Sequence, residues 1–159
     1  GEVLVQGPNV MQGYWNKPEQ TDAVLQDGWY RTGDIGYLDS EGYLYLVDRA
    51  KDMIISGGEN VYCSEVEEVI YQNPKVLEAT VFGVPNEQWG EQVHAVVVPR
   101  DEGLTSEELI DFCRESLGGY KVPRSVEFRS TELPKSGPGK VLKRELRAPY
   151  WEGKDRSIN

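Results

Sequence analysis

The lysine that ends the segment LPKSGPGK, residues 133–140, could contact a phosphate group. Lysine carries a compact positive charge on a long stem, and that charge is worth most where closure of a site excludes water. The following segment KRELR adds a lysine and two arginines to the local positive charge. Lys140 is therefore a candidate for phosphate binding, although this segment taken alone is better explained as a solvated surface turn.

The two common nucleotide-binding motifs are absent from this segment. A Walker A loop needs an earlier glycine and a Ser or Thr after its lysine, whereas this sequence has Pro134 and Val141 at those positions. The dinucleotide-binding fingerprint needs a third glycine where Leu142 stands. Any phosphate contact made by Lys140 must therefore use a different arrangement.

Two glycine-containing segments further upstream are compatible with contacts to a ligand. In TGDIG, residues 32–36, the Asp34 carboxylate can accept hydrogen bonds from a diol such as ribose, but a turn in which Asp34 bonds its own backbone is the simpler explanation. In SGGEN, residues 56–60, the paired glycines either let a ligand approach the backbone or make a tight turn before a helix. In isolation, both segments are better explained as turns.

The composition limits the classes of function. The chain has 159 residues, with 17 Lys and Arg against 27 Asp and Glu, and a formal net charge of −10 at pH 7. Such an acidic chain disfavours sequence-independent binding of nucleic acid or anionic lipid, so any phosphate site must be local. Because no apolar run reaches the ~18 residues of a membrane span and no segment resembles a signal peptide, we expect a soluble, cytoplasmic protein.

The cysteines and the single histidine do not suggest a metal site. Cys63, Cys113 and His94 cannot supply a zinc constellation on their own, and a disulfide is not expected in a cytosolic chain. We predict that both cysteines are buried as small hydrophobic residues, that His94 has a structural or surface role, and that the chain contributes no metal ligand.

Hydrophobic periodicity predicts an α+β fold with a change of pattern near residue 48. The segment before it is rich in turns and short alternating runs, with a β-hairpin loop at 39–42, and is predicted to be all-β. The order after it is helix, strand, strand, helix, strand, which is typical of helices packed on a short sheet. The predicted elements are a helix from Ser64 to Asn73, paired strands at 76–84 and 92–99, a helix from Thr105 to a stop at Gly118, and a strand at 125–130.

Both helices are predicted to begin with a capping box, in which a hydroxyl and a later glutamate satisfy the first backbone N–H groups. Ser64 pairs with Glu67 in the first helix, and Thr105 pairs with Glu108 in the second. These caps place the helix starts next to the apolar positions that should face the sheet.

Three segments occur in a fixed order: YRTGDIGYLDSEGYLYLVDRAKDMIISGGENVYCSEVEE, then VPNEQWGEQVHAVVVP, then LPKSGPGKVLKRELR. Together they resemble the C-terminal third of the AMP-forming acyl-CoA synthetases, whose relatives include firefly luciferase and the adenylation domains of nonribosomal peptide synthetases. The resemblance runs from Gly1 to about Arg147. It is specific for the superfamily and carries almost no information on the acid substrate.

The resemblance implies an enzyme that works in two steps. An acid and ATP form an acyl-adenylate and pyrophosphate; the small C-terminal domain then rotates, and the CoA thiol attacks the adenylate and releases AMP. Because the family's phosphate loop, acid pocket and adenine pocket lie upstream of these residues, and the sequence begins at Gly1 without methionine, we expect a fragment that is inactive alone. The implied domains are 1–47, the β-rich end of the large N-terminal domain; 48–52, the hinge; 53–147, the mobile α+β domain; and 148–159, a loosely held tail.

The resemblance also implies roles for single residues. Lys140 matches the lysine that reaches the carboxylate and the α-phosphate during adenylation. Asp34 matches the aspartate that holds the ribose hydroxyls, Arg49 an arginine near the ribose and phosphate, and Lys51 the hinge position. The implied CoA contacts are Gly57, Gly58 and Glu59 along the pantetheine tunnel, Trp89 and Tyr120 on the adenine, and Arg124 at a phosphate.

The implied ligands are ATP or AMP, with Mg²⁺ held mainly by the large domain, CoA, and a fatty or aryl carboxylic acid. Two alternatives remain open: an adenylating enzyme that transfers its acyl group to a carrier-protein thiol or releases the adenylate, and a non-catalytic domain of the same fold. The lack of a carrier-like GxxS segment favours the CoA ligase, and the intact charged residues disfavour the non-catalytic domain.

Cys63 and Pro138 depart from the family pattern, and we expect them to alter loop stiffness only.

Overall fold

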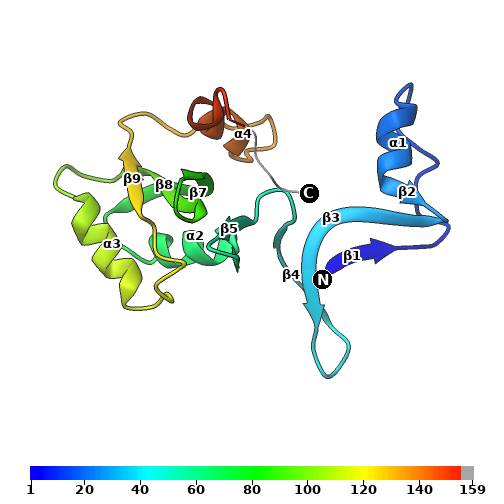
Figure 1. Cartoon of the computed structure of the whole chain (residues 1–159), viewed down its shortest axis with the longest axis horizontal. Coiled ribbons are helices and arrows are strands. Elements are labelled where there is room, and N and C mark those ends of the chain that lie inside the picture. The colour runs from blue at the N-terminus through cyan, green and yellow to red at the C-terminus, as the bar shows by residue number, and fades with distance from the viewer. Residues whose placement is uncertain (155–159) are drawn as a thin grey trace. The chain divides into compact units, whose positions relative to one another are not determined.

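The computed structural model describes residues 1–154, which belong to two compact units (Figure 1). Unit 1 comprises Gly1–Lys51, and unit 2 begins at Asp52. The chain combines helices with sheets, so the predicted α+β class is confirmed. The division falls inside residues 48–52, the segment expected to be a hinge, and the role of that segment in rotation stays a prediction. Residues 155–159 of the expected tail lie outside the described residues. Within the described part, no helix has the length and apolar character needed to cross a membrane.

Unit 1 contains an antiparallel sheet built around one long strand. β3 pairs with β1, with β2 near its start and with β4 near its end. The elements are β1 (Glu2–Val5), α1 (Pro18–Val24), β2 (Leu25–Gln26), β3 (Trp29–Leu38) and β4 (Leu44–Arg49). The β3–β4 hairpin turns at the predicted loop, where the Asp39 carboxylate accepts hydrogen bonds from the N–H groups of Tyr43 and Glu41, both at 2.9 Å. The bond from Tyr43 is the main cause that lowers the pKa of Asp39, so the ionised carboxylate stabilises this turn.

Helix α1 shows that the prediction of an all-β segment before residue 48 was wrong. Pro18 occupies the first turn, where its missing N–H leaves no bond unmade, and Glu19 lies at the positive end of the helix dipole. The Thr21 hydroxyl donates to the Lys17 carbonyl and accepts from the Tyr14 N–H, both at 2.9 Å. Because no residue of α1 is buried, the helix leaves no apolar periodicity in the sequence.

Unit 2 contains a five-stranded sheet with β8 near its centre. β7 and β8 form a long antiparallel hairpin from the Val76–Pro99 pair to the Asn86–Gly90 pair, so their predicted pairing is confirmed. β5 pairs antiparallel and β9 parallel with β8, and β6 pairs with β5. The strands are β5 (Ile54–Ser56), β6 (Glu59–Val61), β7 (Val76–Asn86), β8 (Gly90–Pro99) and β9 (Ser125–Phe128).

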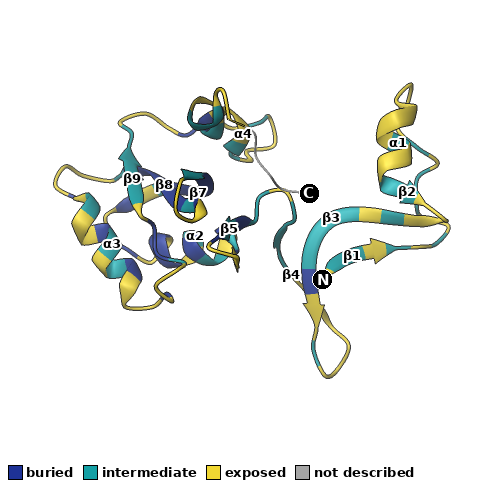
Figure 2. Cartoon of the chain, in the orientation of Figure 1, coloured by how far each residue is buried: buried dark blue, intermediate teal, exposed yellow. Residues whose placement is uncertain are grey.

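The β7–β8 hairpin is buried on both faces (Figure 2). Because successive side chains of a strand point to opposite faces, Val97 of β8 enters one apolar cluster, whereas Val96 and Val98 enter another. Helices α2 (Cys63–Tyr71) and α3 (Ser106–Arg114) complete the first cluster. The two cysteines lie in this cluster, as predicted, and burial raises the pKa of the Cys113 thiol to about 11.

Of the two predicted capping boxes, only the Thr105 half of the second is observed, because the Glu108 carboxylate accepts a hydrogen bond from the Lys75 Nζ at 2.7 Å. The Thr105 side chain caps α3 and accepts a hydrogen bond from the Glu108 N–H at 3.2 Å. The box of Ser64 and Glu67 is wrong, because Tyr62 is the N-cap of α2 and no side chain caps that helix. The predicted end of α3 at Gly118 is also wrong, because the helix ends at Arg114. Directly after it, the backbone N–H groups of Glu115 and Ser116 bond to carbonyls three residues earlier, which is the 3₁₀ pattern.

Glu67 instead closes the outer edge of β7, the last strand on its side of the sheet. Its carboxylate accepts hydrogen bonds from the Thr80 hydroxyl at 3.0 Å and from the Val81 N–H at 2.8 Å. One turn later on α2, the Tyr71 hydroxyl donates to the Ala79 carbonyl and accepts from the Ala79 N–H, both at 3.0 Å. Side chains of α2 thereby satisfy backbone groups that no neighbouring strand pairs.

The C-terminal segment covers the second face of the hairpin. It contains α4 (Lys143–Arg147) and the 3₁₀ turn η1 (Ala148–Trp151), and contributes Leu133, Leu146 and Tyr150 to the second cluster. The Trp151 indole N–H donates to the Gly83 carbonyl at 3.0 Å. The start of the expected loose tail is therefore packed against the sheet.

His94 has a structural role. Its ring is 4% exposed and packs between Phe82 and Tyr150, with ring centroids 5.3 and 4.7 Å away. Its Nδ1 lies 2.7 Å from the Ser125 hydroxyl, which ties β8 to β9. Burial lowers the pKa of His94, so the neutral ring is the form that packs here.

We expect Gly83→Ala to destabilise unit 2 by about 2 kcal/mol, because a core without space must shift around an added group. A Cβ at Gly83 would overlap the Glu91 Oε2 atom and lie 3.2 Å from Ile54 Cγ2. Urea unfolding followed by circular dichroism measures the change. The matched control is Gly119→Ala, where a Cβ meets no atom within 4 Å. Equal stability of the two variants would show that the strand tolerates the added methyl group.

Candidate functional site

In unit 1, Asp34 and Arg49 face each other across β3 and β4. The Arg49 Nε donates to the Asp34 Oδ1 at 2.8 Å, and the side chains are 41% and 30% exposed, respectively. Asp34 lies within a strand, so the turn explanation of this residue is wrong. A half-exposed carboxylate beside a guanidinium offers an acceptor for hydroxyl groups and a donor for phosphate oxygens.

In unit 2, the glycines of SGGEN form the tip of the β5–β6 hairpin. Ser56 pairs with Glu59, so Gly57 and Gly58 make a two-residue turn, with φ values of +61° and +87°. A turn of this type requires positive φ at both positions, which explains the glycine pair. The Gly57 N–H donates to the Trp89 carbonyl at 2.8 Å, which joins this hairpin to the β7–β8 turn.

Trp89 and Arg124 form an exposed aromatic and cationic surface beside that hairpin. The Arg124 guanidinium carbon lies 5.1 Å from the centre of the Trp89 ring, and Trp89 is 36% exposed. The backbone N–H of Arg124 donates to the Val93 carbonyl at 2.9 Å, which fixes the backbone of this arginine beside β8. Tyr120 lies on the loop before Arg124, and the Lys121 Nζ lies 5.6 Å from the centre of the Tyr120 ring. A flat ring with a guanidinium above it can stack on a base and bind a phosphate.

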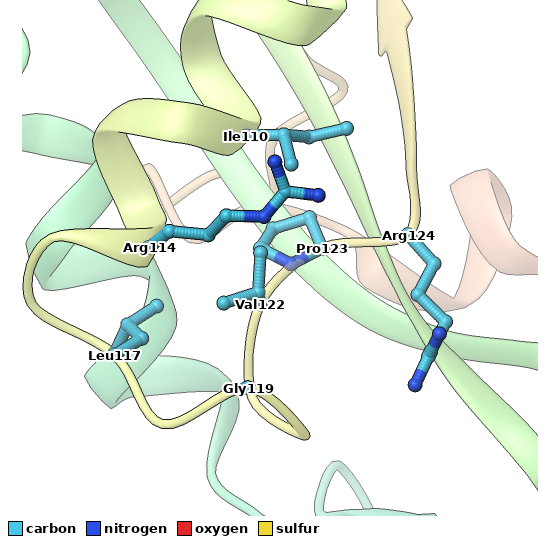
Figure 3. A pocket seen from close by; sticks show the side chains of 7 residues that line it. All are labelled: Ile110, Arg114, Leu117, Gly119, Val122, Pro123 and Arg124. Atoms are coloured by element: carbon cyan, nitrogen blue, oxygen red, sulfur yellow. The ribbon is translucent and has the colours of Figure 1, made fainter.

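A pocket of about 390 Å³ lies between α3 and the loop that leads to β9 (Figure 3). Figure 3 shows the Arg114 guanidinium beside Pro123 and Ile110, while Arg124 extends from the end of the loop. The pocket therefore combines two arginines with apolar walls. Of its lining residues, sequence reasoning nominated only Arg124. Arg114 was not nominated, because an arginine in the last turn of a helix is also common on plain surface helices.

Lys140 is exposed at the end of a closed turn. The Ser136 N–H donates to the Lys140 carbonyl at 2.8 Å, and the Lys140 N–H donates to the Ser136 hydroxyl oxygen at 3.2 Å. The Leu142 N–H donates to the Pro134 carbonyl at 2.8 Å, one step further down the turn. This segment is thus an exposed, hydrogen-bonded turn, which agrees with the solvated surface turn expected from the segment taken alone.

The structure therefore gathers the predicted residues into separate groups. Asp34 and Arg49 are paired in unit 1, whose last residue is Lys51. The glycine hairpin, Trp89 and Arg124 are joined in unit 2, and Lys140 stands on its own turn. In residues 1–154, no group of three or more His, Cys, Asp or Glu is placed to hold a metal ion.

Known proteins resemble this chain closely. Residues 65–140 match the family model of the AMP-binding enzyme C-terminal domain. A long-chain-fatty-acid–CoA ligase of Yersinia pestis is 58% identical over 147 residues, which cover 92% of this chain and 26% of the ligase. The chain thus spans about a quarter of the length of this relative.

Solved structures of other proteins share the fold. The o-succinylbenzoate CoA synthetase from Bacillus subtilis, in complex with its acyl-adenylate intermediate, is 44% identical with a TM-score of 0.85 over 92% of this chain and 30% of the synthetase. The amide bond synthetase from Marinactinospora thermotolerans is 44% identical with a TM-score of 0.82 over 94% of this chain and 30% of the synthetase.

We expect Gly57→Ala to displace the Trp89 ring, because a Cβ at this position would lie 2.7 Å from the ring atom Cε3. The indole N–H resonance of Trp89 in a ¹⁵N-correlated NMR spectrum reports the displacement. Gly58→Ala is the matched control, since it meets the same positive-φ strain but no atom within 4 Å. A Trp89 resonance that responds equally to both variants would assign the effect to backbone strain alone.

Proposed function

We propose that this chain, which belongs through residues 65–140 to the AMP-binding enzyme C-terminal domain family, is part of an AMP-forming acid–CoA ligase. The observation that carries the proposal is Lys140, an exposed amine on a closed turn at the end of the matched segment. The substrate would be a fatty or aryl carboxylic acid, as the names of the ligase from Yersinia pestis and the synthetase from Bacillus subtilis suggest.

In the first step, the carboxylate attacks the α-phosphorus of ATP and pyrophosphate leaves. Negative charge develops on the phosphate oxygens, and the Lys140 ammonium group would stabilise it more strongly in the transition state than in the bound substrates. The Asp34 carboxylate would accept hydrogen bonds from the ribose hydroxyls, and Arg49, held by Asp34, would stay close to the phosphate. The described residues do not fit a Mg²⁺ site, so we propose that any Mg²⁺ that accompanies ATP is held by residues outside this chain.

In the second step, the CoA thiol attacks the acyl carbonyl and AMP leaves. The turn at Gly57 and Gly58 would lie along the pantetheine arm, because residues without side chains leave room for it. Trp89 would stack on the adenine, and Arg124 would bind a phosphate of CoA, with Arg114 available from the pocket that both arginines line. Glu59 and Tyr120 are proposed to border this path.

A second candidate function differs only in the acceptor. The amide bond synthetase from Marinactinospora thermotolerans shares the fold and as much sequence identity as the CoA synthetase. An adenylating enzyme with an amine or a carrier-protein thiol as acceptor is therefore the alternative. The pair of Trp89 and Arg124 favours CoA, because its ring and guanidinium suit the base and phosphates of that ligand.

The test uses the complete protein that carries this chain, with ATP, Mg²⁺, CoA and a panel of carboxylic acids. We expect mass spectrometry to detect an acyl-CoA, and Lys140→Ala to slow acyl-adenylate formation by about 100-fold or more. Thioester formation from supplied acyl-adenylate should change little, because the charge of Lys140 is used only in the first step.

Each other outcome has a distinct meaning. An acyl-adenylate without thioester would support a different acceptor, and no product from a broad panel would support a non-catalytic domain. Equal losses in both half-reactions would remove Lys140 from its assigned role.

We expect Lys51→Pro to slow the thioester half-reaction more than the adenylation half-reaction. Proline fixes φ, so a rotation that requires a change of φ at Lys51 would be hindered. Single-turnover measurements of each half-reaction provide the comparison, with Lys51→Ala as the control for the lost side chain. Unchanged turnover in the proline variant would show that the backbone at Lys51 does not rotate.

A further inference from the structure

We propose that Glu67 and Glu78 are positioning residues that fix the two ends of the Lys140 turn to the sheet of unit 2. In this arrangement Lys140 moves with the whole unit and not on a flexible loop of its own. The inference rests on the proposed function for its catalytic consequence, but the attachment itself is a property of unit 2.

Glu78 of β7 holds the first end of the turn. Its carboxylate accepts a hydrogen bond from the Leu133 N–H at 3.0 Å and forms an ion pair with the Lys135 Nζ. The Glu78 side chain is only 17% exposed, and Leu133 is 2% exposed. The backbone of Lys135 also forms an antiparallel β-bridge with Val141 on the other side of the turn. Fixing one side of the turn therefore also fixes the other.

The protonation of Glu78 follows from these contacts. The hydrogen bond from Lys135, and then that from the Leu133 N–H, lower its pKa below the ordinary value of 4.5. A carboxyl whose pKa falls on folding stabilises the folded state fully above its unfolded pKa and loses that contribution as the pH falls through the folded value. The contact is therefore complete at neutral pH.

Glu67 of α2 holds the second end of the turn. The Lys143 Nζ lies 2.8 Å from its Oε1, and the two side chains are 20% and 21% exposed. The same oxygen accepts the hydrogen bonds from Thr80 and Val81 of β7, so its position is set before Lys143 binds. An ion pair with one partner already fixed loses less side-chain entropy when it forms than a pair of two mobile side chains.

Apolar contacts support both ends. Leu133 lies before the turn and Leu146 after it, at 2% and 4% exposure, and both belong to the second cluster with Phe82 of β7. Val141 packs against the same cluster from within the turn. The base of the turn is thus part of the core of unit 2, while its tip carries Lys140 into solvent.

This attachment matters because electrostatic stabilisation of a transition state depends on position. A displacement of ~1 Å of a catalytic group can cost about 100-fold in rate. A lysine on an unattached glycine-rich loop would sample many positions, most of them unproductive. Two carboxylates at the base limit that sampling and leave only the lysine side chain itself to adjust.

The test compares Glu67→Gln and Glu78→Gln with wild type in the complete protein that carries this chain. Glutamine keeps an acceptor for the backbone N–H groups and removes the charge that holds the lysines. We expect kcat of acyl-adenylate formation to fall about tenfold in each variant with little change in KM for ATP, and thioester formation from supplied adenylate to stay within about twofold. We also expect faster amide hydrogen exchange at Lys140 and Leu142, whose N–H bonds close the turn.

The matched control is Glu132→Gln, whose carboxylate also lies near the Lys135 Nζ, at 3.9 Å, but is 83% exposed. We expect it to change neither readout, because exposed pairs of this kind contribute little.

The outcomes separate the two proposals. Unchanged hydrogen exchange and unchanged adenylation in both glutamine variants would overturn the positioning role, whatever Lys140→Ala does. Equal losses in both half-reactions would overturn it as well, since they indicate a general structural defect. Faster exchange in the glutamine variants, together with a Lys140→Ala variant of normal activity, would support the attachment and reject the proposed catalytic function.

Discussion

The burial of the β7–β8 hairpin on both faces is the constraint from which the rest of unit 2 follows. A strand pair without a solvated face needs cover on two sides and partners for every backbone group at its edges. Helices α2 and α3 cover one face, and the segment with α4 and η1 covers the other. Strands β5 and β9 complete the pairing of β8, whereas the outer edge of β7 receives side chains from α2. Chemically useful groups are therefore left to the places where the chain leaves this core: the β7–β8 turn with Trp89, the glycine turn bonded to it, and the Lys140 turn.

Much of this fold could be predicted from local patterns, and the failures share a physical cause. The apolar runs of β7 and β8 and the hydroxyl cap at Thr105 were recognised because their signals are local. The partner of Glu67 was assigned wrongly, because the nearby backbone and the distant edge of β7 offer the same N–H groups and only the tertiary fold decides between them. Helix α1 was missed because a helix without buried residues has no apolar stripe to recognise.

The candidate site could be predicted from residue types only in part. Asp34 looked like a turn residue until its cross-strand partner Arg49 was known, since a carboxylate and a guanidinium that are distant in sequence carry no joint signal. The family resemblance supplied the proposed roles of these residues and of Lys140, which stay predictions. It did not indicate the pocket at Arg114, which arises from the packing of a helix end against a loop. Nor did it indicate the carboxylates below Lys140, because a glutamate that pairs with a lysine elsewhere in the chain looks like any surface glutamate.

The charge of the chain explains why such positioning is needed. With a formal net charge of −10, the chain as a whole repels polyanions such as ATP and CoA. Salt screens that repulsion beyond ~8 Å at physiological ionic strength, so attraction must come from cations in direct contact with the phosphates. Among the basic residues near Lys140, Lys143 is paired with Glu67 and Lys135 with Glu78, so their charge is largely compensated locally. These two ion pairs hold the base of the turn in place, and the side chain of Lys140 is exposed on the turn. For a chain of this net charge, the proposed contact with phosphates would depend on where its lysines lie more than on how many it has.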